Sequence, residues 1–140
     1  MLSRSTARMA ATTQRAAAIR RSAPDAPVAV TERVVDRLLA ACGLRILSPT
    51  GFAVAIEDGE EPSARDTARM NALLTDRRVR LLIDNVDTRS TATAEVRRLA
   101  ARHGVEVVEV HESMPADTPS LTTWVRATVA ALARALGVGA

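Results

Sequence analysis

Several side chains that could bind a cation follow directly after apolar runs in this sequence. These candidates are Glu32, Asp84, Asn85, Asp87, His111 and Glu112. Carboxylates that are brought together repel one another unless a cation or a proton joins them. Oxygen ligands combined with an imidazole suit a cation such as Mn²⁺ or Zn²⁺. The residue types therefore predict a divalent metal site, provided that the fold brings these positions to one place.

Each candidate also has a structural interpretation. Asp and Asn after a strand are common turn formers and helix caps, and this is the preferred interpretation for Asp84, Asn85 and Asp87. Glu32 could serve as a first-turn acid that complements a helix dipole. His111 and Glu112 are neighbours, so they point to opposite faces if the strand continues through them. Only one of these two is then expected to reach the site.

Four apolar runs have the length and composition of strands, and they cover residues 28–31, 44–47, 79–83 and 105–110. Helical patterns separate these runs. The residues predicted to cap the helices are Thr31 for a helix ending at Gly43, Ser63 for 64–74, Ser90 or Thr91 for 93–102, and Thr118 for 121–136. Phe52 is expected to pack beneath a loop, and the acidic run from Glu57 to Glu61 is expected to be solvated.

Strands that alternate with helices predict βαβ units and a mostly parallel sheet flanked by helices. The expected fold class is therefore α/β, a single Rossmann-like lobe with a four-stranded sheet. In an open parallel sheet, ligands bind beyond the carboxyl ends of the strands. All the candidate metal ligands follow strands, so the predicted topology gathers them at that edge.

Composition limits the number of domains and excludes a membrane span and cysteine-based sites. The chain has 140 residues, of which 47% are apolar and 1% aromatic, so one domain with a core of Val, Leu, Ile and Ala is expected. No apolar stretch approaches the roughly 18–20 residues of a membrane span. The single cysteine, Cys42, excludes an internal disulfide and a cysteine-based zinc cage, and it is expected to be buried.

The positive charge is uneven along the chain. All 19 basic residues are Arg, and five of them lie in residues 1–23, which contain no acid. Residues 24–140 carry 14 Arg against 16 acids, and their two aromatic residues offer few platforms on which bases could stack. Nucleic-acid binding is therefore not expected.

Residues 1–26 are predicted to be an Arg/Ala-rich helix or tail without the apolar segment of a signal peptide, and residues 27–140 to be the α/β lobe.

Three segments resemble, in order and spacing, the C-terminal lobe of the zinc and manganese receptors that serve ABC transporters. They are VAVTERVVDRLLAACGLRILSPTGFAVAIEDGEEPSARD, VRLLIDNVDT and HGVEVVEVHESMPADTPSLTTWV. The resemblance covers about residues 27–137. One subgroup of that family has a helix containing Gly-Phe followed by a Glu-Pro-Ser turn, which the first segment matches. Residues 1–26 then resemble the end of the helix that joins the two lobes.

In that family, four side chains hold the ion between two lobes, and two of them are His from the first lobe. The positions here that match the second lobe's ligands are Glu32 and Glu112, with His111 as a helper. The resemblance implies a binding protein, not an enzyme, with Zn or Mn as its ion and weak binding by the single lobe. Its implied partners are an ABC permease and a missing N-terminal lobe or a second copy, and its implied location is extracytoplasmic.

Two other interpretations remain open from the residues alone. One is a divalent-metal-dependent enzyme in which Asp84, Asp87 or Glu112 acts as acid or base, although no nucleophile–base pair or phosphate-binding loop is present. The other is a protein-interaction or regulatory module with the Arg-rich segment as an electrostatic arm.

Overall fold

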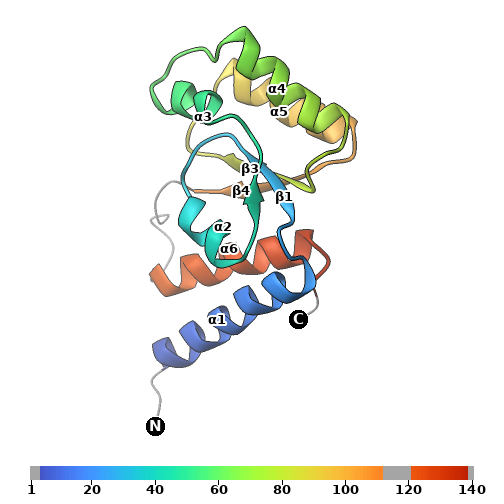
Figure 1. Ribbon diagram of the computed structural model, residues 1–140. Coiled ribbons are helices and arrows are strands. Elements are labelled where there is room, and N and C mark those ends of the chain that lie inside the picture. The colour runs from blue at the N-terminus through green and yellow to red at the C-terminus, as the bar shows by residue number, and fades with distance from the viewer. Residues whose placement is uncertain (1–3, 112–120, 139–140) are drawn as a thin grey trace.

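A computed structural model describes residues 4–111 and 121–138 (Figure 1). Its centre is a four-stranded sheet in the order β2-β1-β3-β4, with every neighbouring pair parallel. The strands are β1 (Pro27–Val30), β2 (Arg45–Ile46), β3 (Leu81–Asn85) and β4 (Glu106–Val110). The α/β lobe with a parallel sheet, predicted from the alternation of apolar runs and helical patterns, is confirmed.

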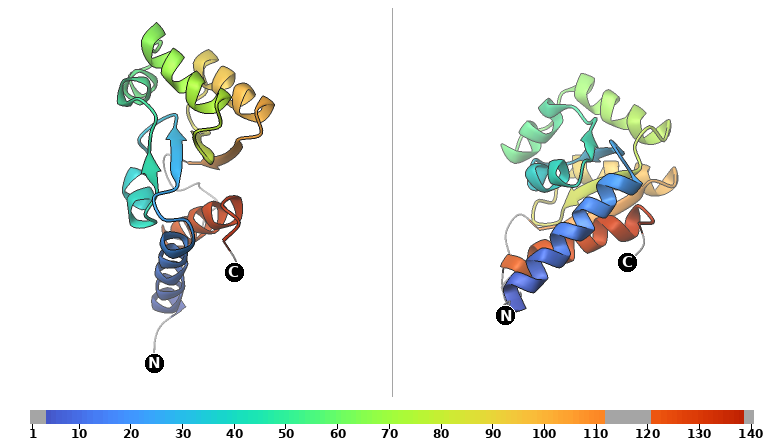
Figure 2. Two further views of the ribbon diagram at one scale, coloured as in Figure 1. Left: turned by 45° about the vertical axis from the view of Figure 1, so that its right-hand side comes forward. Right: turned by 60° about the horizontal axis from the view of Figure 1, so that its bottom comes forward.

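Helices cover both faces of the sheet. One face is covered by α1 (Arg4–Ser22), α2 (Asp36–Ala41) and α6 (Leu121–Ala135), and the other by α3 (Thr50–Glu57), α4 (Ala64–Thr75) and α5 (Thr91–Arg102). Alternation along β1 divides the core, because Val28 and Val30 face the first group while Ala29 faces the second. The two views of Figure 2 show α1 lying alongside α6.

The Arg-rich N-terminal segment forms a helix that belongs to the core. Ala16 and Ile19 of α1 are buried in the same cluster as Val129 and Leu132 of α6. Cys42 lies in this cluster too and is fully buried, as predicted. Within the described residues, no helix is both long and apolar enough to cross a membrane.

Two of the predicted helix caps are confirmed. Ser63 Oγ accepts a hydrogen bond from the amide of Asp66 at 3.1 Å and begins α4. Ser90 Oγ accepts one from the amide of Thr93 at 3.2 Å and begins α5. Each bond satisfies an amide that has no partner inside its helix. The predicted cap at Thr118 lies outside the described residues.

The predicted cap at Thr31 is wrong. Helix α2 begins only at Asp36, after a bend over residues 31–35, and its N-cap Val35 has no side-chain cap bond. Thr31 is fully buried, and its hydroxyl is committed to β3, where it donates to Asp84 Oδ1 and accepts from the Asn85 amide. Glu32 is consequently not a first-turn helix acid.

Strand β3 and helix α3 also differ from the predictions. Strand β3 continues through Asp84 and Asn85, which are 0% and 2% exposed. Asp84 is therefore not a turn residue. Asn85 does form the predicted turn, because its Oδ1 accepts the amide of Asp87 and its carbonyl accepts the amide of Thr88. Helix α3 was implied by the family resemblance but not by the local pattern. Phe52 lies in α3 and is fully buried against the second face of the sheet, not beneath a loop.

Candidate metal-binding edge

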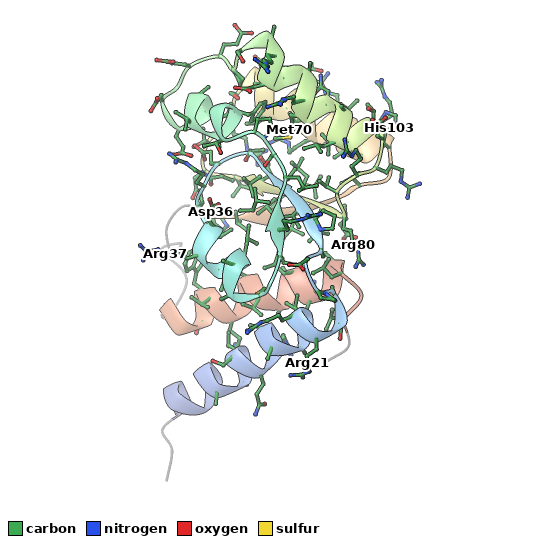
Figure 3. All side chains as sticks on the ribbon, in the orientation of Figure 1. Arg21, Asp36, Arg37, Met70, Arg80 and His103 are labelled. Carbon is green, nitrogen blue, oxygen red and sulfur yellow. The ribbon has the colours of Figure 1, made fainter. Side chains whose placement is uncertain are left out.

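The carboxyl edge of the sheet is the rim formed where β1, β3 and β4 end. Glu32 follows β1, Asn85 ends β3, and His111 follows β4 directly. Because the three strands are parallel and adjacent, their ends meet along this rim. Figure 3 shows Asp36 and Arg37, just beyond β1, on the opposite side of the molecule from Arg80 and His103, which precede β3 and β4.

Asn85 holds the side chain of Glu32. The Asn85 amide donates from Nδ2 to Glu32 Oε2, across the gap between β1 and β3. The two residues are 2% and 6% exposed, so the bond is shielded from bulk water. A buried carboxylate needs hydrogen-bond donors to offset its lost hydration, and Asn85 supplies one. The carboxylate of Glu32 is thereby fixed at the rim of the sheet.

The same asparagine connects Glu32 to β4. The amide of Asp87 donates to Asn85 Oδ1 at 3.0 Å, and Asp87 Oδ1 lies 3.3 Å from Nδ1 of His111. Asn85 therefore bonds to Glu32 through Nδ2 and to Asp87 through Oδ1. Contacts thus run without interruption from Glu32 to His111 across three strand ends. Glu112 is the next residue and lies outside the described residues.

Asp84 lies beneath this rim with a structural role. Its side chain is fully buried, and Oδ2 pairs with Arg97 Nη1 of α5 at 3.1 Å. Its other oxygen accepts the hydroxyl of Thr31 at 3.3 Å. Both oxygens already have partners on the protein, so Asp84 ties β1, β3 and α5 together and is not available as a ligand.

The described part of the chain does not contain a complete metal site. No group of three or more His, Cys, Asp or Glu side chains is placed to share an ion among residues 4–111 and 121–138. Glu32 and His111 lie on the same edge as predicted, yet tetrahedral zinc sites use four ligands, or three and a water. A complete site would need further ligands, which the described residues do not supply at this edge.

A cavity of about 570 Å³ borders the segment that follows Glu32. Its lining includes Arg33, Asp36, Glu57 and Trp124. Arg33 donates from Nε and Nη2 to the two oxygens of Glu57 at 3.0 and 2.9 Å, and its backbone amide bonds the same carboxylate. This bidentate pair lowers the pKa of Glu57 and raises that of Arg33. It fixes the segment after β1 to the end of α3.

Asp36 in the same cavity is less well satisfied. Its Oδ1 is buried and has no hydrogen-bond partner among the described residues. Burial raises the pKa of Asp36, an effect that Arg33 opposes and Glu57 reinforces. The folded chain therefore holds a proton on Asp36 at a pH where the unfolded chain has released it.

This raised pKa predicts that Asp36→Asn stabilises the protein by an amount that depends on pH. Because the folded state binds the proton more tightly, the contribution of Asp36 to stability falls as pH rises through and above its ordinary pKa. The uncharged Asn does not titrate, so the stability of Asp36→Asn relative to the wild type should increase from about pH 3 to about pH 7. Urea denaturation at several pH values measures this difference. A difference that does not change with pH would contradict it.

The family model described as zinc-uptake complex component A, periplasmic, matches residues 2–135. No curated protein sequence matches the chain.

Solved structures share the fold. The manganese complex of the SBP FpvC from Pseudomonas aeruginosa superposes with a TM-score of 0.64 at 21% identity, covering 94% of this chain and 48% of that chain. The laminin-binding protein Lmb of Streptococcus agalactiae gives 0.67 at 14%, covering 94% and 49%. The periplasmic zinc-binding protein TroA from Treponema pallidum gives 0.64 at 16%, covering 93% and 47%. The chain thus spans about half the length of the structures that it matches.

Proposed function

The chain belongs to the zinc-uptake complex component A family, and on that premise we propose that it acts as the C-terminal, metal-binding lobe of a two-lobed receptor. This membership confirms the resemblance seen in the sequence. In this proposal the ion, zinc or manganese, is cargo. The lobe binds and delivers it, and no reaction is catalysed.

The observation that carries the proposal is the linked edge from Glu32 through Asn85 and Asp87 to His111. A carboxylate fixed by a buried asparagine is preorganised, so little side-chain entropy remains to be lost when an ion binds. We propose that Glu32 and Glu112 are ligands from this lobe and that His111 assists them. Asp87 would then orient the imidazole of His111, as carboxylates commonly do for metal-binding histidines.

The remaining ligands come from a second lobe in this proposal. The chain covers about half of each matched structure, so the second lobe would be supplied by further sequence, a separate polypeptide or a second copy. Residues 1–26 then belong to the helix that joins the lobes. The proposed location is extracytoplasmic and the proposed downstream partner is the permease of an ABC transporter.

Calorimetric titration of the chain with Zn²⁺ and Mn²⁺ tests the ligand assignment. We expect weak binding by this single lobe. Glu32→Gln and Glu112→Gln should each lower the affinity at least as much as the roughly 10–100-fold loss typical of outer-shell changes. Binding should weaken as pH falls, because protons compete for the carboxylates and the imidazole.

The control is Glu106→Gln, which removes an exposed carboxylate at the opposite end of β4. It should leave the titration unchanged. Isotherms for Glu32→Gln and Glu112→Gln that match the wild type would remove both residues from the proposed site.

A further inference from the structure

Exposed arginines gather at the amino edge of the sheet, the side opposite the candidate metal edge. They come from the ends of several elements, and this set, the basic edge, consists of Arg20, Arg21, Arg45, Arg77, Arg78, Arg80, Arg102 and Arg134. Figure 3 shows Arg21, Arg80 and His103 along this side. Among the described residues, only three acids, all exposed, lie with these arginines: Asp25, Asp76 and Glu106.

The opposite edge carries a cluster of acids, although Arg33, Arg37 and Arg89 also lie there. The exposed carboxylates of Glu57, Asp58, Glu60 and Glu61 follow one another at the end of α3 and in the loop to α4. The near balance of charge over residues 24–140 therefore conceals a separation into a basic end and an acidic end. A molecule polarised in this way is oriented by a charged surface before it makes contact.

Helix dipoles explain only part of the basic edge. Arg20, Arg21, Arg102 and Arg134 lie in the last turns of α1, α5 and α6, where positive charge is favourable. Helix α4 ends at Thr75 and has no basic residue in its last turn, and Arg77 and Arg78 follow it. Arg45 begins β2. The helix dipole therefore does not explain these three arginines. The guanidinium groups of these three have no hydrogen bond or ion pair within the part of the chain that the structure describes.

The backbone at Arg77 is unusual for an arginine. Arg77 follows α4 with a φ of 51°, in the left-handed region that favours glycine. Glycine occupies this position after α2, α3, α5 and α6, with φ of 70–73° at Gly43, Gly59, Gly104 and Gly137. The end of α4 thus carries a strained arginine where four other helix ends carry glycine. The cap bonds from the amides of Arg77 and Arg78 to the carbonyls of Leu74 and Leu73 account for this φ, but they do not require an arginine.

We infer that the basic edge is a docking surface for an anionic phospholipid bilayer. The arginines spread over the ends of separate elements, which suits a flat surface with many phosphates more than one small anion. The cavity of about 310 Å³ at this edge is lined by only two of them, Arg77 and Arg80. Guanidinium groups bind phosphate oxygens through paired hydrogen bonds.

A nucleic acid fits this surface less well. The chain has two aromatic residues, Phe52 and Trp124. Phe52 is fully buried, and Trp124 lines the cavity beyond β1, away from the basic edge. Bases therefore have no stacking platform at the arginines. Docked by the basic edge, the lobe turns its acidic end and the candidate metal edge away from the bilayer, towards the aqueous compartment.

Vesicle co-sedimentation of the 140-residue chain tests this inference. We expect binding to phosphatidylglycerol vesicles and none to pure phosphatidylcholine, with a loss on added salt as the Debye length shortens. Each arginine near a charged bilayer changes the partition coefficient about fivefold, so Arg77→Gln/Arg78→Gln should lower it about 25-fold. The matched control Arg65→Gln/Arg69→Gln removes two exposed charges from α4 and should change it less than about twofold.

The variant Arg77→Gly distinguishes an effect on vesicle binding from an effect on stability. It should lower vesicle binding about fivefold without lowering the melting temperature, because glycine relieves the left-handed backbone. Three results would overturn the inference: no binding to phosphatidylglycerol, equal losses in the two double variants, or displacement of the chain from vesicles by single-stranded DNA. None of these bears on metal binding, so the proposed function is tested separately.

Discussion

Replacing Phe52 with alanine should lower the free energy of unfolding by about 3–5 kcal/mol, the usual cost of removing a buried aromatic ring. Phe52 is fully buried and packs in the cluster that includes Met70, Leu82 and Val96. No other phenylalanine or tyrosine is present in the chain, and Met70 together with the mostly branched side chains around it can fill only part of the space. Since small domains are stable by only about 5–15 kcal/mol, this single change would leave little stability.

Urea denaturation followed by far-UV circular dichroism measures this loss. Phe52→Leu should retain most of the stability, because it keeps an apolar side chain that fills part of the volume. Val54→Ala, at a half-buried position of the same helix, is the control and should cost much less. A loss below about 1 kcal/mol for Phe52→Ala would show that α3 does not pack against the sheet as described.

The effect of Phe52 reaches the candidate site through α3. The helix ends at Glu57, whose carboxylate bonds both the backbone amide and the guanidinium of Arg33. Arg33 is the residue after Glu32. Anchoring α3 by one aromatic ring therefore also fixes the segment on which the first candidate ligand lies.

Much of the fold can be predicted from local sequence patterns. Each apolar run of the strands is bounded by helical periodicity, and that alternation is enough to predict a parallel sheet. Ser63 and Ser90 cap helices whose partners lie three residues away, so the information is local. The carboxyl edge, with Glu32 and His111, then follows from topology alone.

The missed features depend on residues far apart in the chain. Thr31 has the sequence of a helix cap, yet its hydroxyl bonds residues 53 and 54 positions away. Arg33 and Glu57 are 24 residues apart, and no local pattern relates them. Helix α3 has only eight residues and no side-chain cap at Pro49, so its local signal is weak.

Asn85 had a signal that could have been used. It continues an apolar run, and a polar residue in a strand covered on both faces must find a hydrogen-bond partner. Interpreted in that way, Asp84 and Asn85 predict partners on neighbouring elements, which for Asn85 come in addition to its turn. The structure supplies them as Arg97 for Asp84 and Glu32 for Asn85.

Arg97→Ala should be about as destabilising as Phe52→Ala, through electrostatics instead of packing. Asp84 is fully buried, whereas the Arg97 side chain is 26% exposed. Removing the arginine leaves a buried carboxylate without its counterion, a change that typically costs about 3–5 kcal/mol. The exposed pair Arg98 and Glu95, also on α5, is the control, and Arg98→Ala should cost less than about 1 kcal/mol.

The double variant Arg97→Ala/Asp84→Ala distinguishes an unpaired charge from lost packing. If the unpaired carboxylate carries the cost, removing it as well should restore part of the stability, and the two single losses will sum to more than the double loss. Strict additivity would contradict an interaction between the two side chains. Because Thr31 bonds both Asp84 and the amide of Asn85, we also expect Arg97→Ala to disturb the hold of Asn85 on Glu32. The salt bridge at α5 would then be part of what keeps the candidate metal ligand in place.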